Sequence, residues 1–458
     1  MRESLRSSPA AIFAFLAALG GLVLVMLIPP MAGGNETFNF HRAAAVASGH
    51  WLIEPASVPA GIVRFIEVSD AAFPEGAQPP YSYSRAQFEA LAAIPLAAGE
   101  PAILQPNPIA VLHPFSYLPQ VPVLWLGQLL GLPPLLLFYL GRIAGLAAGI
   151  ALTFLAIRAI PVHKHALAAV ALLPTILFSR STFDADQLTN GLAFLFLAMV
   201  MREIAGEGRI RAGALAGLAA AAFILAQCKS AYLLLPFFAL AIPSARFGSV
   251  GAKLAACAVI ALPGIAAGAA WMIALKQTYF QGIHYRTWSG EVFPDRQTAL
   301  ILADPLSYAA VLLRTFFLTP LIRDTLVGLI GVFGPPVRMP PFFYPALTVA
   351  LASVFVAEPR FAPSALQAWP TRLLAAFLFL TAAVIVLTLL YLQWNRLGAP
   401  VVEGFQGRYL YPLIPLVLVL LPSGGRRAFG LDAPAWLALL GALGVGGTWY
   451  VTWSTYLA

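Results

Sequence analysis

Charged residues are scarce in this sequence: they form 10% of its 458 residues, whereas hydrophobic residues form 60%. An ordinary soluble domain carries about 25% charged residues. Together with a mean hydropathy of +0.83, this shortage excludes an ordinary soluble fold. We expect an all-α polytopic membrane protein.

Cysteine is almost absent. The two cysteines, Cys228 and Cys257, both lie in apolar segments and show no Cys-x-x-Cys or Cys/His spacing. The sequence therefore indicates neither a disulfide framework nor a cysteine-based metal site.

The net charge of +8 has a topological explanation. If the N-terminus is cytoplasmic, the short loops on that side carry thirteen basic and five acidic residues, and the opposite side is neutral. This distribution follows the positive-inside rule. The basic excess then reports orientation and contact with anionic lipid, and it gives no indication of nucleic-acid binding.

Apolar runs predict about eleven transmembrane helices in a single domain, residues 1–458. The first, of about twenty residues, is long enough to span and exceeds the apolar region of a signal peptide. The runs are 10–29, 134–157, 166–179, 187–201, 212–228, 231–243, 253–275, 342–357, 371–393, 409–422 and 434–454.

Two long segments between these runs are expected outside the cell membrane, residues 30–133 and 276–341. Frequent prolines in the first segment exclude long helices beyond residue 50. Before that point, residues 38–48 can form one helix that stops at Gly49. The apolar stretches 117–132 and 306–320 are short, which predicts half-helices at the interface.

The stretch after the first apolar run carries the main candidate site. Glu36, His41 and Arg42 lie within seven residues at the membrane surface. Ionisable groups at that depth are costly and usually functional. We therefore take Glu36 as the candidate catalytic carboxylate.

Further polar residues lie at the ends of apolar runs that the expected topology places on the same side as Glu36. For a lone cation such as Lys229 or Arg408, snorkelling to lipid head groups is the simpler interpretation. The set as a whole, with several carboxylates at one level, favours a site. Its members are His113, Asp184, Asp186, Lys229, Tyr232, Arg408 and Tyr409.

Three members have open alternatives. Asp184 and Asp186 could bind Mg²⁺ or Mn²⁺ through oxygen, or they could cap the helix that follows, which is the commoner use of aspartate there. Tyr409 could contact substrate or anchor the chain at the interface.

The order of these motifs resembles a bacterial family of predicted membrane proteins, domain of unknown function 2142. The family pattern, roughly Pro-Pro-x-x-x-Asp-Glu-x-x-His-Phe-x-Arg-Ala, corresponds to residues 29–43 here, with Asn35 in place of the aspartate and His41 one place late. The resemblance continues through residues 181–186, 229–236 and 406–412. An acidic residue directly after the first helix also resembles the GT-C superfamily of glycosyltransferases.

This resemblance implies a glycosyltransferase of the bacterial inner membrane with its active site on the outer side. A sugar would move from a polyprenyl-phosphate donor to a hydroxyl of a glycan or lipid-linked acceptor. Glu36 would act as general base, and Lys229 and Arg408 would stabilise the leaving phosphate. Arg42, Asp184, Asp186, Tyr232 and Tyr409 would contact substrate, and His41 and His113 would either contact it or act as hydrogen-bonding residues of the loop. The alternatives are a flippase or transporter, and a ligase, of lipid-linked saccharide.

Overall fold

The structure is a computed structural model that describes residues 8–73, 79–107, 111–276, 285–334, 337–360, 363–422 and 424–457. The chain forms two compact units. The first comprises residues 1–202, 330–363 and 422–458, and the second comprises residues 203–329 and 364–421.

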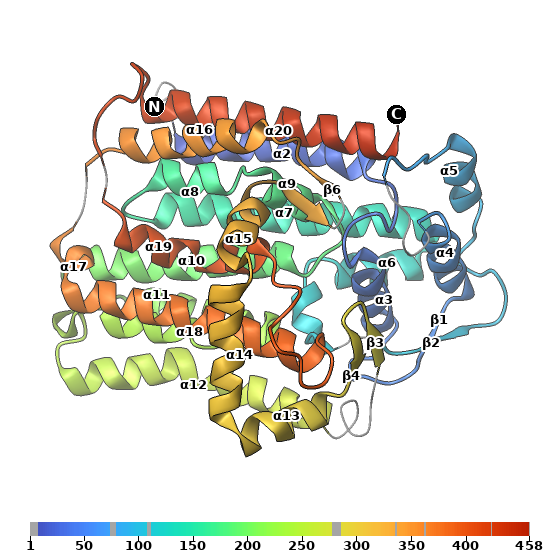
Figure 1. Ribbon diagram of the computed structural model, residues 1–458, viewed down its shortest axis with the longest axis horizontal. Coiled ribbons are helices and arrows are strands. Elements are labelled where there is room, and N and C mark those ends of the chain that lie inside the picture. Colours follow the sequence, from blue (N-terminus) through green and yellow to red (C-terminus); the bar gives the residue numbers. More distant parts are fainter. Residues whose placement is uncertain are drawn as a thin grey trace. The chain divides into compact units, whose positions relative to one another are not determined.

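Long helices form the body of the first unit. Figure 1 shows α2, α16 and α20 running side by side, and α2 also packs against α7. The helices are α2 (Pro9–Leu27), α7 (Pro134–Ala159), α8 (Lys164–Val170), α9 (Pro174–Ser181), α16 (Phe343–Ala357) and α20 (Ala433–Tyr456). Helix α10 (Asp186–Ala205) begins in this unit and ends in the second.

The segment between α2 and α7 consists of short elements, as its prolines predict. The expected helix at 38–48 is confirmed as α3 (Glu36–Ala47), which is followed by Gly49 at a φ of 97°. The other elements are β1 (Ala56–Val58), α4 (Ala60–Asp70), α5 (Arg85–Ala92), β2 (Ala102–Leu104), the 3₁₀ turn η2 (Pro114–Tyr117) and α6 (Val121–Leu129). Strands β1 and β2 pair antiparallel. A second antiparallel pair, β5 (Val332–Gly334) and β6 (Val337–Arg338), completes the unit.

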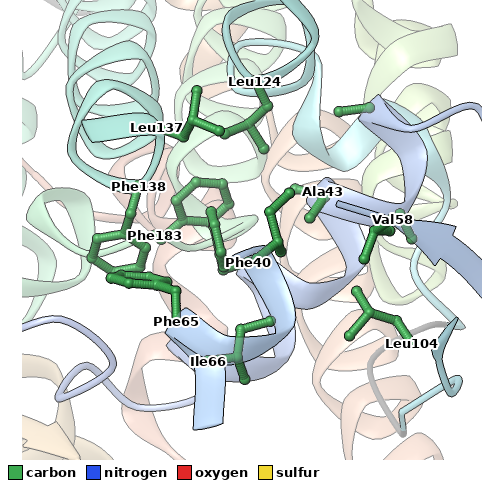
Figure 2. Packing of buried hydrophobic residues seen from close by; sticks show 14 of the residues in the cluster. Phe40, Ala43, Val58, Phe65, Ile66, Leu104, Leu124, Leu137, Phe138 and Phe183 are labelled. Atoms are coloured by element: carbon green, nitrogen blue, oxygen red, sulfur yellow. The ribbon is translucent and has the colours of Figure 1, made fainter. Parts of the chain in front are cut away.

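Four phenylalanines hold this segment to the helical body (Figure 2). Phe40 of α3 packs edge-to-face on Phe65 of α4, Phe138 of α7 and Phe183, with ring centroids 5.2 to 5.7 Å apart. Each ring is fully buried. Edge-to-face pairs add about 0.5–1.5 kcal/mol beyond their buried area, so the cluster fixes α3 relative to α7.

The second unit contains a helix pair, α11 (Ala212–Cys228) packed along α12 (Val250–Leu275), together with α18 (Trp369–Gln393). Its other helices are α13 (Pro294–Ala303), α14 (Pro305–Leu318), α15 (Leu321–Gly331), α17 (Ser364–Gln367) and α19 (Ile414–Leu420). The 3₁₀ turns are η3 (Ser230–Tyr232), η4 (Leu235–Ala241), η5 (Ser244–Arg246) and η7 (Gly407–Leu413). A hairpin joins β3 (Tyr285–Thr287) to β4 (Gly290–Val292).

The predicted count of eleven spans is wrong. Within the described residues, six helices are long and apolar enough to cross a membrane: α2, α7, α10, α12, α18 and α20. A seventh span is possible if α13 and α14 count as one broken span, which is bent by 107° at the break between them. The chain is nevertheless mostly helical and has several apolar helices, as a multi-pass membrane protein requires.

Proline explains much of the lower count. The run 166–179 is divided into α8 and α9 by Pro174, and the run 231–243 forms 3₁₀ turns around Pro236 and Pro243. Pro412 and Pro415 shorten the helix in the run 409–422. Proline removes a helical hydrogen-bond donor and clashes with the preceding turn, so hydropathy alone overcounts here. The two remaining runs form helices of 17 and 15 residues, α11 and α16.

The two expected half-helices are short helices in the structure. The stretch 117–132 contains α6, and the stretch 306–320 contains α14. Their placement at a membrane interface stays a prediction.

Candidate functional site

Glu36 is the first residue of α3 and is only 1% exposed. The chain leaves α2 at Leu27 and turns back so that the carboxylate points into the first unit. Gly33 N donates to Oε2 at 3.1 Å, and Phe183 N donates to Oε1 at 2.5 Å. The carboxylate therefore joins the turn before α3 to the segment before α10.

Arg142 is the ionic partner of Glu36. Its Nε and Nη2 donate to the two carboxylate oxygens, each at 2.7 Å, and both side chains are completely buried. Such bidentate pairing is the strongest geometry for arginine and carboxylate. The charges are thus compensated inside the protein, as buried charges must be.

Arg142 also closes the end of α2. Its remaining N–H groups donate to the carbonyls of Val25 and Ile28 from Nη1, at 2.9 and 2.7 Å, and to that of Pro29 from Nη2, at 2.9 Å. Carbonyls at a helix C-terminus have no partner within the helix. All five guanidinium donors are therefore used, three of them on backbone.

The four hydrogen bonds to Glu36 have a chemical consequence. A carboxylate offers about four lone-pair sites, and all are occupied by Arg142, Gly33 and Phe183. A substrate proton therefore reaches the carboxylate only if one donor moves away. The role of Glu36 as general base stays a prediction.

Arg142 is the residue that sequence reasoning missed. It lies inside the 26-residue apolar helix α7. An ionisable residue inside a membrane span normally pairs with an opposite charge or with backbone carbonyls. An arginine within a long apolar run is therefore the sequence signal that predicts a carboxylate partner for Arg142.

Asp184 and Asp186 lie at the start of α10 and are both buried. Asp184 Oδ1 accepts the N–H of Asp186 at 3.0 Å, which is a capping contact. Among the described residues, no group of three or more His, Cys, Asp or Glu side chains could hold a metal ion. The geometry supports the capping alternative for Asp184.

Arg42 and His41 form hydrogen bonds within the segment between α2 and α7. Arg42 donates to the carbonyls of Trp51 and Leu52 at 2.8 and 3.1 Å, and burial lowers the pKa of its guanidinium to about 10. The amide of Asn107 lies 2.8 Å from His41 Nδ1, and burial lowers the pKa of His41 to about 4. Both side chains line a cavity of about 10 Å³, too small for a sugar.

His113 caps the turn η2 by accepting the N–H of Phe115 at Nδ1, at 3.2 Å. Burial lowers the pKa of His113 to about 4, and the charge of Arg42 contributes to this shift. The turn itself is tied to α3 by Tyr117, whose hydroxyl donates to Asn39 at 2.7 Å. These residues shape the segment that carries Glu36.

Four predicted site residues come together in the second unit around one aromatic ring. Lys229 Nζ lies 5.8 Å from the centre of the Tyr409 ring, and Arg408 Cζ lies 5.6 Å from it. Tyr232 donates its hydroxyl to the Tyr409 carbonyl at 2.8 Å. We call these residues the cationic cluster. Lys229, Arg408 and Tyr409 are each half-buried.

Local backbone explains why distant segments meet there. Lys229 is extended, at a φ of −149°, and separates α11 from η3. On the other segment, a Cβ added at Gly407 would lie 2.3 Å from the carbonyl oxygen of Thr325. The absence of a side chain at Gly407 therefore lets η7 approach α15 closely. Arg408 and Tyr409 follow Gly407 directly, and the Tyr409 ring is the one that Lys229 lies near.

Comparison with protein-family models matches residues 18–417 to the family described as "Predicted membrane protein (DUF2142)". The chain belongs to this family. No curated protein matches the sequence, and no solved structure matches it. Membership of the DUF2142 family identifies a membrane protein, and the match extends over Glu36, Arg142 and the cationic cluster alike.

Proposed function

We propose that this protein is a membrane glycosyltransferase of the GT-C kind, which moves a sugar from a polyprenyl-phosphate donor to an acceptor hydroxyl of a cell-envelope glycan. One observation carries the proposal. Two cations from segments far apart in sequence, Lys229 and Arg408, flank the half-buried ring of Tyr409.

The cationic cluster suits a phosphate that gains charge as it leaves. In the reaction, the acceptor oxygen bonds to the anomeric carbon while the bond from that carbon to the phosphate oxygen breaks. The acceptor proton passes to a base, and the released polyprenyl phosphate keeps the electron pair. Cations directed at this developing charge in a partly dry site lower the barrier, and arginine can bind phosphate through two donors.

Glu36 is the proposed base. Its ion pair with Arg142 fixes the position of the carboxylate, and the Phe183 or Gly33 N–H would have to give way to the substrate. The alternative is that Glu36 only positions α3. A substitution pair separates the two roles. If Glu36 is the base, E36Q and the double variant E36Q/R142M are both inactive. If the ion pair only shapes the protein, the double variant regains activity relative to R142M.

Donor binding tests the carrying observation directly. Full-length protein in nanodiscs would be titrated with undecaprenyl phosphate by calorimetry. We expect K229M and R408M each to weaken binding by about tenfold, because a hydrogen bond to a charged group contributes about 1.5–3 kcal/mol. R314M is the matched control, an exposed arginine on α14.

Turnover distinguishes transfer from transport. Incubation with polyprenyl-phosphate-linked hexoses and an acceptor glycan should release polyprenyl phosphate. Binding without any release would favour a flippase, and unchanged affinity in both K229M and R408M would refute the cationic cluster as the phosphate site.

A further inference from the structure

An exposed tryptophan stands at the tip of the β3–β4 hairpin in the second unit. Trp288 is 63% exposed. One face of its indole stacks on Trp394, with ring centroids 5.5 Å apart and planes inclined by 22°. Since Trp394 covers one face, the exposed area belongs mainly to the other face and the edge.

The hairpin is fastened to the end of α18. Tyr285 donates its hydroxyl to the carbonyl of Gln393, and Thr287 Oγ1 donates to the carbonyl of Trp394 at 2.8 Å. Arg396 N donates to Ser289 Oγ at 3.3 Å. Contacts on both sides of Trp288 therefore limit its movement. A rigid aromatic side chain loses little conformational entropy when it binds a ligand.

The backbone of Gly404 packs closely against the Trp288 ring. A Cβ added there would lie 2.5 Å from the Trp288 ring, and Gly404 has a φ of 82° that other residues rarely adopt. Gly404 lies four positions before Arg408 in the sequence. The stacked pair therefore adjoins the segment that leads into the cationic cluster.

The hairpin and the end of α18 also carry exposed charged side chains. Arg286 and Glu291 are opposite each other in the hairpin register, and a Cβ added at Gly290 would lie 3.4 Å from Arg396 Cβ. All three charged residues are exposed. An exposed apolar ring face on a polar hairpin matches a pyranose, which has an apolar C–H face and a rim of hydroxyls.

We propose that Trp288, backed by Trp394, binds a pyranose unit of the acceptor glycan away from the reacting hydroxyl. This proposal rests on the proposed function for the class of ligand, and it adds a second binding point separate from the phosphate. Arg396, whose N–H donates to Ser289 beside Trp288, would contact the sugar hydroxyls.

Saccharide binding by the full-length protein in phosphatidylcholine nanodiscs tests the proposal. The probes are hexasaccharides of glucose, mannose or N-acetylglucosamine, with saturation-transfer NMR and tryptophan fluorescence as readouts. We expect W288A to weaken binding of the best probe by at least about tenfold, as loss of a buried aromatic anchor does. W288F should bind within about threefold of the natural protein, because it keeps an aromatic face.

Two more variants serve as controls. W125A removes a tryptophan of similar exposure, 53%, from α6 in the first unit and should leave binding unchanged. G404A should displace the indole and weaken binding as W288A does.

Three results would overturn the proposal: no binding of any probe by the natural protein, equal binding by W288A, or a W288A effect confined to thermal stability in the bilayer. The last would make Trp288 a membrane anchor. Undecaprenyl phosphate affinity is measured in the same samples. If W288A leaves saccharide binding unchanged while K229M and R408M weaken undecaprenyl phosphate binding, only this inference is refuted. If W288A weakens saccharide binding while K229M and R408M leave undecaprenyl phosphate binding unchanged, only the phosphate site is refuted.

Discussion

The two charged regions of this protein differ in how deeply they are buried. Arg142 and Glu36 in the first unit are completely buried, and all their hydrogen-bonding positions are used within that unit. Lys229 and Arg408 in the second unit are half-buried beside an aromatic ring. The buried pair ties α3 to α7, whereas the half-buried cations are partly exposed and can also contact a ligand.

This contrast separates two meanings of a charge in an apolar sequence. Both regions break the hydropathy pattern in the same way. Their difference lies in burial: the first is enclosed completely among backbone carbonyls and amides, and the second is half-buried beside an aromatic side chain. Substitutions can break or sharpen the contrast.

The largest effect should follow removal of Arg142. R142M leaves the Glu36 carboxylate buried without its counter-charge, and breaking a buried pair typically costs about 3–5 kcal/mol. Thermal unfolding in detergent should show a large drop for R142M and a smaller one for E36Q/R142M. R314M, on an exposed arginine, should match the natural protein. If R142M is as stable as the natural protein, the pair does not organise the first unit.

A smaller effect should follow from crowding the cationic cluster. In G407A the added Cβ would lie 2.3 Å from Thr325 O and 2.5 Å from Leu329 N, both backbone atoms of α15. The turn η7 must shift, at a cost of about 1–3 kcal/mol, and Arg408 and Tyr409 move with it. We expect undecaprenyl phosphate affinity to fall while the stability effect of R142M is unaltered. G213A, with open space at its Cβ, is the control, and normal affinity in G407A would contradict the geometry.

A third prediction concerns pH. Burial lowers the pKa of His41 and His113 to about 4 in the folded protein, from an ordinary value of 6.5. Between these values the unfolded chain binds more protons, so stability is complete above about pH 6.5 and falls as the pH drops towards 4. The unfolding midpoint should decrease across this window, and less so in H41Q/H113Q. An identical pH profile in that variant would exclude these histidines as the cause.

Local signals in the sequence predicted local structure well. Gly49 ends α3 because it adopts a positive φ that other residues avoid, and the prolines after residue 50 permit only short helices. Asp184 caps α10, as one of its two interpretations required. Each of these outcomes depends on neighbours along the chain.

Long-range features were harder. The pairing of Glu36 with Arg142 joins residues 106 positions apart, and no periodicity connects them. The span count failed because hydropathy does not register the proline breaks near Pro174 or Pro412. The grouping of Lys229 with Tyr409 was expected only from a shared level in the membrane, whereas the structure supplies the common ring.

The attachment of Arg142 to the end of α2 also imposes an order on assembly. Helix α2 is synthesised first, and the residue that donates to the carbonyl of Ile28 lies 114 residues later in the chain. A lone arginine is costly within the bilayer, so α7 enters the membrane most favourably once α2 and Glu36 are already there to receive it. We therefore expect the ion pair to couple insertion of the two helices during biogenesis, so that R142M uncouples them.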